Sequence, residues 1–157
     1  MLLSLVFSFR NEEDVLDELI GRTVRVLETV DTSYEFVFVN DSSTDRSLEI
    51  LNSHRAAHPN IRIITMSRQF GVSPCIMAGL KFAKGDVVIY MDADLQDPPE
   101  LIPEMILLYK NGADVVNTVR VVRKGESKTK MLLTRLAYRI INRISDIHLL
   151  ENAGDFK

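Results

Sequence analysis

The chain has 157 residues, 46% of them hydrophobic and 26% charged, with a net charge of −3, which is ordinary for one soluble globular domain with a sizeable core. Its single cysteine excludes an internal disulfide and a thiolate-rich metal site. No stretch approaches the ~20 apolar residues of a membrane span, and the first residues lack the basic flank of a signal peptide. We expect a protein of the reducing cytoplasm without a nucleic-acid partner.

The net charge is distributed unevenly along the chain. Residues 1–119 carry −8, whereas residues 120–143 carry +7. An acidic first part suits the binding of a cation, and a basic segment suits an anionic partner. The sequence therefore predicts an acidic part that binds a cation and a basic segment that binds an anionic partner.

Apolar runs and helical spacing alternate along the first 119 residues. Buried strands are predicted at residues 2–9, 34–39, 61–66, 86–92 and 114–119. Helices are predicted over residues 11–30, 46–58, 72–84 and 99–110. This alternation, with connections long enough for crossovers, predicts a doubly wound α/β fold with a mostly parallel sheet.

The fourth predicted strand runs into a cluster of polar side chains. Asp92, Asp94 and Gln96 would lie at its carboxyl end, the edge where open α/β sheets bind ligands. Oxygen groups packed this tightly repel one another unless a hard cation such as Mg²⁺ or Mn²⁺ lies among them. An Asp at a strand end is also a common turn former. An aspartyl nucleophile of the phosphatase type fits less well, because Gln96 stands where those enzymes have a Thr and their motif normally closes the first strand.

Polar residues at the other strand ends have two interpretations each. Asp41 and Asp45 flank a Ser/Thr loop after the second strand. Ser43, Thr44 or Asp45 could cap the next helix there, and Asp41 could bind a base or ribose. Glu12, just past the first strand, would line the same crevice. Arg68, after the third strand, could face a diphosphate or pair with a surface carboxylate.

The segment from residue 120 to about 150 is basic. A loop with Arg120, Arg123 and Lys124 precedes a predicted amphipathic helix over about residues 127–147. Four basic residues of this helix fall within roughly 80° of one another on a helical wheel: Lys128, Arg135, Arg139 and Arg143. Such a helix suits a membrane surface. The alternative is that its apolar stripe packs on the sheet and its arginines are solvated.

Five motifs together resemble one known family. They are Val6–Glu13, Val39–Asp45, Ala83–Asp86, Met91–Glu100 and Ala153–Lys157. In this order they resemble the family-2 glycosyltransferases, and within them the polyprenyl-phosphate sugar transferases, which include dolichol-phosphate mannose synthases and bacterial undecaprenyl-phosphate glycosyltransferases. The Gln96-Asp97 pair is closer to the bacterial branch.

The resemblance implies a GT-A fold, a nucleotide-diphosphate sugar donor (UDP- or GDP-sugar) and Mg²⁺ or Mn²⁺ as cofactor. It assigns the nucleotide sugar to the strand ends, with the residues Ser8, Arg10, Glu12, Asp41, Arg68, Asp92 and Gln96. It assigns the metal and diphosphate to Asp92, Asp94 and Gln96. Asp155 would lie near the reacting sugar or acceptor, and Asp94, Asp155 and Arg120 would be the catalytic residues.

The same resemblance assigns an acceptor to the basic segment. Polyprenyl phosphate and the membrane surface would meet a basic set there: Arg120, Arg123, Lys124, Lys128 and Arg139. The family continues past this point, often into transmembrane helices, and the chain ends inside its last motif. We therefore expect residues 1–157 to form one GT-A catalytic domain, truncated at its carboxyl end, that works at the cytoplasmic face of the membrane.

Several positions depart from the family pattern. Ser8 and Arg10 replace the usual Pro and Tyr or Thr, and Asn40 replaces the first Asp of an Asp pair. Ser42 stands where Gly is usual, which bears on the geometry of its loop. Lys157 replaces an Arg and lacks the bidentate fork that binds phosphate.

The expected reaction is an inverting transfer to a phosphate oxygen. A phosphomonoester is mostly ionised near neutral pH, so it needs less help from a general base than a sugar hydroxyl does. One alternative is a family-2 transferase acting on a saccharide or lipopolysaccharide hydroxyl, for which Asp155 would be a genuine base. Another alternative is a nucleotide-binding module without turnover.

Overall fold

The computed structural model describes residues 1–118 and residue 143. The chain divides into two compact units, one of residues 1–116 with 156–157 and one of residues 117–155. The first unit holds the strands, helices and pocket of the described residues. The predicted helix over residues 127–147 lies outside them, apart from Arg143, which is helical and exposed.

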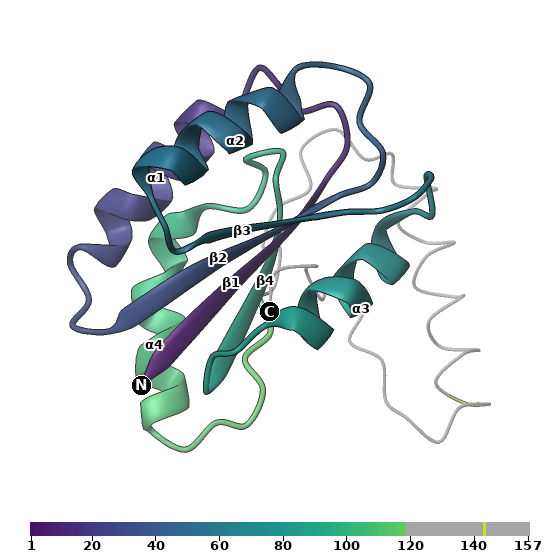
Figure 1. The fold of residues 1–157 in the computed structure, drawn as a ribbon. Helices are drawn as coiled ribbons and strands as arrows, with labels where there is room; N and C mark the ends of the chain where they lie inside the picture. The colour runs from purple at the N-terminus through teal and green to yellow at the C-terminus, as the bar shows by residue number, and fades with distance from the viewer. Residues whose placement is uncertain (119–142, 144–157) are drawn as a thin grey trace, which may run out of the picture. The chain divides into compact units, whose positions relative to one another are not determined.

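Four parallel strands form one sheet in the order β3-β2-β1-β4 (Figure 1). They are β1 (Leu2–Phe9), β2 (Ser33–Asn40), β3 (Ile61–Thr65) and β4 (Val87–Asp92). The first strand in the sequence is central: β1 pairs with β2 along its whole length and with β4 from Leu3 opposite Val87 to Ser8 opposite Asp92. The predicted parallel α/β sheet is confirmed.

Helices cover both faces of this sheet. Figure 1 shows α3 on one face and the other three helices on the opposite face. The helices are α1 (Leu16–Leu27), α2 (Ser47–Ala57), α3 (Val72–Phe82) and α4 (Ile102–Lys110), the last preceded by a 3₁₀ turn, Pro99–Leu101. Because both faces are covered, the strands are apolar almost throughout rather than alternating with polar residues.

The two faces of the sheet differ in composition. Toward α1, α2 and α4 the strands present mostly large apolar residues, and Phe7, Phe36 and Phe38 pack there as an aromatic row. Toward α3 the apolar part is small and consists of Val6, Val37 and Tyr90. Successive residues of a strand point to opposite faces, so the polar residues of β1 share this second face with Val6.

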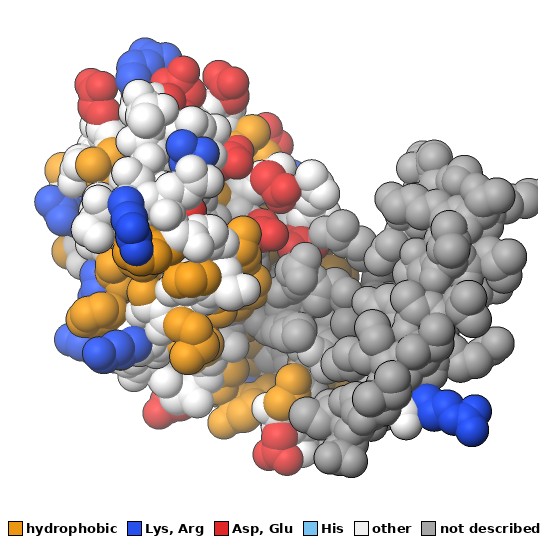
Figure 2. All heavy atoms as spheres, turned by 90° about the vertical axis from the view of Figure 1, so that its right-hand side faces the viewer, with side chains coloured by type: hydrophobic (Ala, Val, Ile, Leu, Met, Phe, Trp, Pro, Cys, Tyr) orange, Lys and Arg blue, Asp and Glu red, His pale blue; other side chains and the backbone are white. Residues whose placement is uncertain are grey.

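The outer surface of α3 is unusually apolar. Met77 is 66% exposed and Leu80 42% exposed. Figure 2, which views the side of the molecule that carries α3, shows hydrophobic side chains gathered there. The inner side of α3 lies very close to the sheet: a Cβ added at Gly79 would lie 2.3 Å from Cγ1 of Val6.

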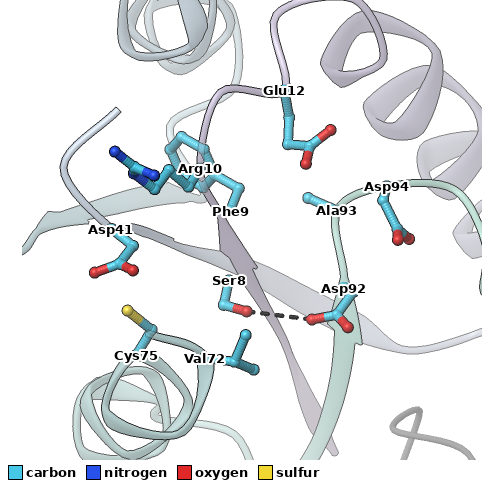
Figure 3. A pocket seen from close by; sticks show the side chains of 10 residues that line it. All are labelled: Ser8, Phe9, Arg10, Glu12, Asp41, Val72, Cys75, Asp92, Ala93 and Asp94. Carbon is cyan, nitrogen blue, oxygen red and sulfur yellow. Dashed lines mark hydrogen bonds between the residues drawn. The ribbon is translucent and has the colours of Figure 1, made fainter. Parts of the chain in front are cut away.

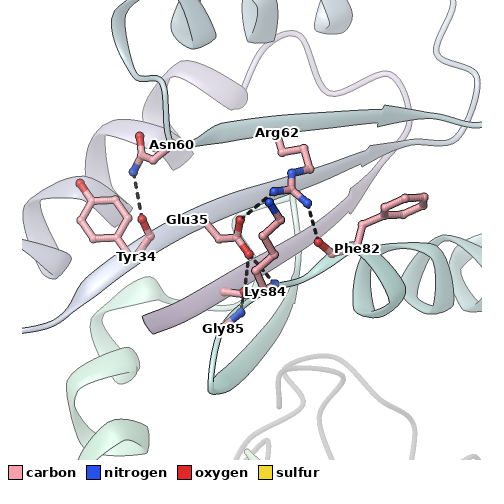
Figure 4. Close-up of polar contacts among 8 residues, drawn as sticks. Tyr34, Glu35, Asn60, Arg62, Phe82, Lys84 and Gly85 are labelled. Atoms are coloured by element: carbon pink, nitrogen blue, oxygen red, sulfur yellow. Dashed lines mark hydrogen bonds and ion pairs between the residues drawn. The ribbon is translucent and has the colours of Figure 1, made fainter. Parts of the chain in front are cut away.

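A polar network fastens the amino end of the sheet (Figure 4). Glu35 on β2 is buried, and its Oε1 accepts hydrogen bonds from the Ser4 hydroxyl and the Lys84 N–H, both at 2.7 Å. Its Oε2 accepts one from Arg62 at 3.4 Å. Gly85 donates to Ser4 Oγ at 2.8 Å, and a Cβ at Gly85 would lie 2.6 Å from the Ser4 nitrogen. The loop before β4 is thereby held directly against β1.

Two predictions of secondary structure are wrong. Residues 114–118 form no strand: Val116 packs against the core and Val115 is 69% exposed, but no strand within residues 1–118 pairs with them. An apolar sequence pattern forms a β-strand only where a neighbouring strand pairs with it. The first helix begins at Leu16 rather than near residue 11, because Glu12 and Glu13 are held in a loop.

None of the described helices is long and apolar enough to cross a membrane.

Candidate functional site

A pocket of about 240 Å³ lies at the carboxyl edge of the sheet. Figure 3 shows that its walls come from the ends of β1, β2 and β4 and from the start of α3. The lining residues are Ser8, Phe9, Arg10, Glu12, Asp41, Val72, Cys75, Asp92, Ala93 and Asp94. The structure thus brings together six of the residues that the sequence predicts for nucleotide-sugar and metal binding, namely Ser8, Arg10, Glu12, Asp41, Asp92 and Asp94.

Glu12 reaches the pocket because two loops are tied together. The backbone N–H of Glu12 donates to Ser47 Oγ at 2.8 Å, and that of Glu13 donates to Asp45 at 3.1 Å. In return, Asn11 Oδ1 accepts the N–H of Thr44 at 2.8 Å. Asp45 also accepts the N–H of Ser47 at 3.0 Å at the start of α2. Asp45 therefore satisfies a backbone N–H in the first turn of α2, which is the capping role that the sequence offered it.

Three residues with positive φ follow the strands that form the pocket. They are Asn11 (φ 58°), Ser42 (φ 59°) and Leu95 (φ 60°), after β1, β2 and β4 respectively. Left-handed backbone is uncommon for residues other than glycine, and such residues cluster at functional sites. Ser42 stands where the resembling family usually has Gly, and its backbone keeps the conformation that glycine favours.

The hydrogen bonds of Asp41 mainly stabilise the fold. It is 6% exposed, and its two oxygens accept the backbone N–H groups of Phe70 at 2.7 Å and Gly71 at 2.9 Å. Burial alone would raise the pKa of this carboxyl, but these hydrogen bonds and one from Cys75 outweigh it and leave the pKa below its usual value. Asp41 is therefore a fixed, ionised group that joins β2 to the start of α3.

Asp92 and Asp94 face the same pocket with different surroundings (Figure 3). Oδ1 of Asp92 accepts hydrogen bonds from the hydroxyls of Tyr90 and Ser8, the latter at 3.3 Å. Oδ1 of Asp94 accepts the N–H of Gln96 in the following turn, at 3.0 Å, and no other hydrogen bond from the described part of the chain. Asp92 is anchored in the sheet, and Asp94 stands on the loop after it.

The electrostatics of this edge suit a cation. Partial burial raises the pKa of Glu12, and the negative charges of Asp94, Asp45 and Asp92 raise it further. Within the described residues no three His, Cys, Asp or Glu side chains converge closely enough to hold a metal ion by themselves. Mg²⁺ is commonly held by one or two carboxylates together with substrate phosphates. Asp92 and Asp94 fit that arrangement.

Some predicted site residues do not line the pocket. Gln96 is exposed, and only its backbone N–H contacts Asp94. Arg68 is exposed too, with its guanidinium 4.8 Å from the centre of the Phe70 ring. The remaining predicted residues lie outside the described part of the chain: Arg120, Arg123, Lys124, Lys128, Arg139 and Asp155.

Cys75, the single cysteine of the sequence, lines the pocket although no sequence motif pointed to it. It is fully buried at the start of α3 and faces Asp41 (Figure 3). Burial, and then the charge of Asp41 and a hydrogen bond to it, raise the pKa of its thiol to about 11. The thiol is therefore not a nucleophile at neutral pH. Its position one turn after Gly71, at the start of a helix, was the only sequence signal for its place in the pocket.

The sequence has curated relatives along its whole length. The family model described as "Glycosyl transferase family 2" matches residues 4–157. An "Uncharacterized glycosyltransferase YkcC" of Bacillus subtilis is 44% identical over 98% of the chain and 48% of its own length. A "Prophage bactoprenol glucosyl transferase homolog" of Escherichia coli is 37% identical over 100% of the chain and 51% of its own length. An "Undecaprenyl-phosphate 4-deoxy-4-formamido-L-arabinose transferase" of Edwardsiella ictaluri is 40% identical over 89% and 42%. The chain thus spans about half the length of these relatives.

Solved structures share the fold. S. aureus TarS 1–349 in complex with UDP-GlcNAc matches 68% of the chain and 32% of its own, with a TM-score of 0.52 and 26% identity. The mannosyltransferase PcManGT from Pyrobaculum calidifontis, in complex with GDP-Man and Mn²⁺, matches 89% and 38%, with a TM-score of 0.60 and 18% identity. The second likeness concerns the fold alone. These are GT-A glycosyltransferases, so the predicted fold class is confirmed.

Proposed function

The chain belongs to glycosyl transferase family 2, and from this premise we propose that it carries the donor site of an inverting enzyme that transfers a sugar from a UDP- or GDP-sugar to a polyprenyl phosphate. The observation that carries the proposal is the acidic pocket at the carboxyl edge of the sheet, in a chain that matches a bactoprenol glucosyl transferase homologue from end to end.

The pocket supports a nucleotide diphosphate as ligand. Its position at the ends of β1, β2 and β4 is the usual ligand position in open α/β sheets. Asp92 and Asp94 would hold Mg²⁺ or Mn²⁺ together with the diphosphate oxygens. When bound, the ion offsets the negative charge that develops on the departing nucleoside diphosphate. Glu12 and Arg10, on the other side of the pocket, would contact the nucleoside.

The acceptor side of the proposal rests on the relatives and on the basic segment. Two of the relatives reported above carry the names "bactoprenol glucosyl transferase homolog" and "undecaprenyl-phosphate 4-deoxy-4-formamido-L-arabinose transferase". Residues 120–143 carry a net charge of +7, which suits an anionic lipid phosphate at the cytoplasmic face of a membrane. Arg120, Arg123 and Lys124 would orient the phosphate, with Lys128 and Arg139 nearer the lipid surface. Asp155 would lie beside the reacting sugar.

The reaction would be a direct displacement. A phosphate oxygen of the acceptor forms the new bond to the anomeric carbon, and the bond from that carbon to the donor diphosphate breaks with inversion. Because the acceptor phosphate is mostly ionised at neutral pH, no strong general base is needed. The residues act mainly by holding the two substrates in line and by stabilising charge on the leaving group.

Calorimetry tests the donor site first. We would titrate UDP and GDP, each with Mn²⁺, Mg²⁺ or a chelator, into the full-length protein and into Asp94→Ala. We expect metal-dependent binding of one nucleotide, weakened at least roughly 100-fold in the variant because a metal ligand is lost. Asp31→Ala, which removes an exposed carboxylate outside the pocket, is the matched control and should bind like wild type.

The outcome decides between the proposal and its rivals. If neither nucleotide binds to the full-length protein, the donor-site assignment is wrong. If a nucleotide binds, sugar transfer is measured from the matching nucleotide sugar to undecaprenyl phosphate and to a saccharide hydroxyl acceptor. Transfer to the hydroxyl alone would favour the other family-2 reaction, and absence of any transfer would favour a binding module.

A further inference from the structure

Tyr90 is a buried residue that neither the sequence motifs nor the proposed reaction uses. Tyr90 is 6% exposed, and its ring packs with Val6 and Val37 on the sheet face that α3 covers. A tyrosine hydroxyl carried into such a face needs a polar partner. Here the hydroxyl donates a hydrogen bond to Oδ1 of Asp92.

The backbone explains why these two groups meet. Tyr90 and Asp92 are two residues apart on β4, so their side chains leave the same face of the sheet. Ser8 lies opposite Asp92 in the register of β1 and β4, and so projects from this face as well. The Ser8 hydroxyl lies 3.3 Å from Oδ1 of Asp92 and 3.3 Å from the Tyr90 hydroxyl. The three side chains form one polar group at the edge of the pocket.

The number of protons on the two hydroxyls indicates that Tyr90 is the main hydrogen-bond donor to Asp92. A tyrosine hydroxyl has one proton, and in this geometry it goes to Asp92. The Ser8 proton can then be given either to Asp92 or to the Tyr90 oxygen. Among the residues that the structure describes, both hydrogen bonds to Asp92 are made to Oδ1, and none of these residues occupies Oδ2. The Tyr90 ring is held by packing, and its hydroxyl therefore fixes the carboxylate more firmly than the serine can.

We propose that Tyr90 is a positioning residue for the donor site: it locks Asp92 Oδ1 against the sheet and so presents Oδ2 to the metal-bound diphosphate or ribose of the nucleotide sugar. The inference rests on the proposed function, because it concerns how Asp92 binds the donor. Tyr90 itself acts only through Asp92. Preorganisation of this kind avoids the cost of ordering the carboxylate when the ligand arrives.

The test is a double-mutant cycle in the full-length protein. Tyr90→Phe keeps the ring and its packing and removes only the hydroxyl. We expect the dissociation constant for UDP or GDP with Mn²⁺ to rise roughly tenfold, the size of one lost hydrogen bond to a charged group. In an Asp92→Asn background the same substitution should change affinity less than about twofold, because two residues that act as one unit are not additive. Ser8→Ala should cost about threefold.

Controls separate this role from a structural one. Tyr34→Phe makes the same chemical change at a half-buried tyrosine on β2 that does not line the pocket, and should leave nucleotide affinity unchanged. In turnover assays Tyr90→Phe should raise KM for the nucleotide sugar more than it lowers kcat. Thermal unfolding of each variant checks that the sheet is intact.

Each outcome has a defined meaning. If wild type binds nucleotide but Tyr90→Phe binds equally well, the inference is overturned and the proposed function stands. The inference is also overturned if Tyr90→Phe weakens binding equally in the wild-type and Asp92→Asn backgrounds, since the effect would then not pass through Asp92. If wild type binds neither nucleotide, the proposed function is wrong, and this inference, which depends on it, is wrong as well.

Discussion

The two ends of the sheet hold their carboxylates in opposite ways. At the amino end, Glu35 accepts hydrogen bonds from Ser4, Lys84 and Arg62, and so serves the fold. At the carboxyl end, partial burial and the nearby charges of Asp94, Asp45 and Asp92 raise the pKa of Glu12. This difference shows that a structural carboxylate is recognised by the hydrogen-bond donors around it and not by its burial alone.

Asp41 lies between these extremes. It lines the pocket, as a ligand-binding residue should, yet both of its oxygens already accept backbone N–H groups. A carboxylate has about four acceptor positions, so it can still contact a nucleoside. Its first role is to hold Phe70 and Gly71 so that α3 begins beside the pocket.

The largest expected effect lies at the amino end. Gly85→Ala places a Cβ 2.6 Å from the Ser4 nitrogen and 2.8 Å from the Leu2 carbonyl oxygen. Because these are backbone atoms of the central strand, we expect a loss of about 3 kcal/mol in the free energy of unfolding. Urea denaturation measures it. Gly21→Ala is the matched control: nothing lies within 4 Å of the added Cβ in α1, and the variant should gain up to about 1 kcal/mol. Equal stability of the two alanine variants would mean that the loop before β4 is not held against β1.

Removing the structural acid should have a smaller effect on stability and none on binding. Glu35→Ala leaves the Lys84 N–H and the Ser4 hydroxyl without their acceptor, which costs about 2 kcal/mol. The comparison is with Asp94→Ala, which should lose nucleotide binding while keeping its stability. Glu104→Ala on the exposed side of α4 is the control. A strong loss of nucleotide affinity in Glu35→Ala at temperatures where it is folded would contradict the division between the two ends.

The smallest effect concerns the pH dependence of Glu12. Burial and the neighbouring acids raise its pKa in the folded state. The stability linked to this group is therefore fully present below the unfolded pKa and is lost as pH rises through the folded pKa. Glu12→Gln removes that loss, so without metal or nucleotide it should be more stable than wild type at pH 7 by under about 1 kcal/mol, since solvent screens the charges. The advantage should disappear near pH 4.

Unfolding measured at both pH values checks this, with Glu104→Gln as control. A variant that is less stable than wild type at pH 7 would show that Glu12, like Glu35, serves the fold.

The sequence predicted the sheet well because its strands are apolar on both faces. Four of the five predicted strands are present with bounds that agree within one or two residues. The segment after α4 has the same kind of sequence but no neighbouring strand among the described residues, and a residue pattern carries no information about pairing partners. The start of α1 was predicted too early for a related reason. Acidic residues at 12–14 are typical of a helix start, but here the N–H groups of Glu12 and Glu13 are bound by the loop after β2.

The pocket was predictable in outline and not in its hydrogen bonds. Strand-end acids converge because parallel strands end at one edge, so Glu12, Asp41, Asp92 and Asp94 all line it. Gln96 does not, because the positive φ of Leu95 begins a turn that leaves its side chain exposed. The spacing of Tyr90 and Asp92 on β4 places them on one face, but the contact of Ser8 with Asp92 depends on the register of β1 and β4, which local sequence does not encode.

The sheet order has a consequence for how the protein is made. Of the four strands of this sheet, the one that comes earliest in the sequence pairs with two others, and Leu2 is hydrogen-bonded to Asp86, 84 residues later. At about 5–20 residues per second, translation takes roughly 3 to 10 s to proceed from the end of β2 to the end of β4. During that interval one edge of an apolar strand is unpaired and open to aggregation.

The pocket at the carboxyl edge is also the last part of the sheet to form, because β4 contributes Asp92 and the loop after it contributes Asp94. A ligand of this pocket therefore cannot stabilise early folding intermediates. It can stabilise only the finished sheet.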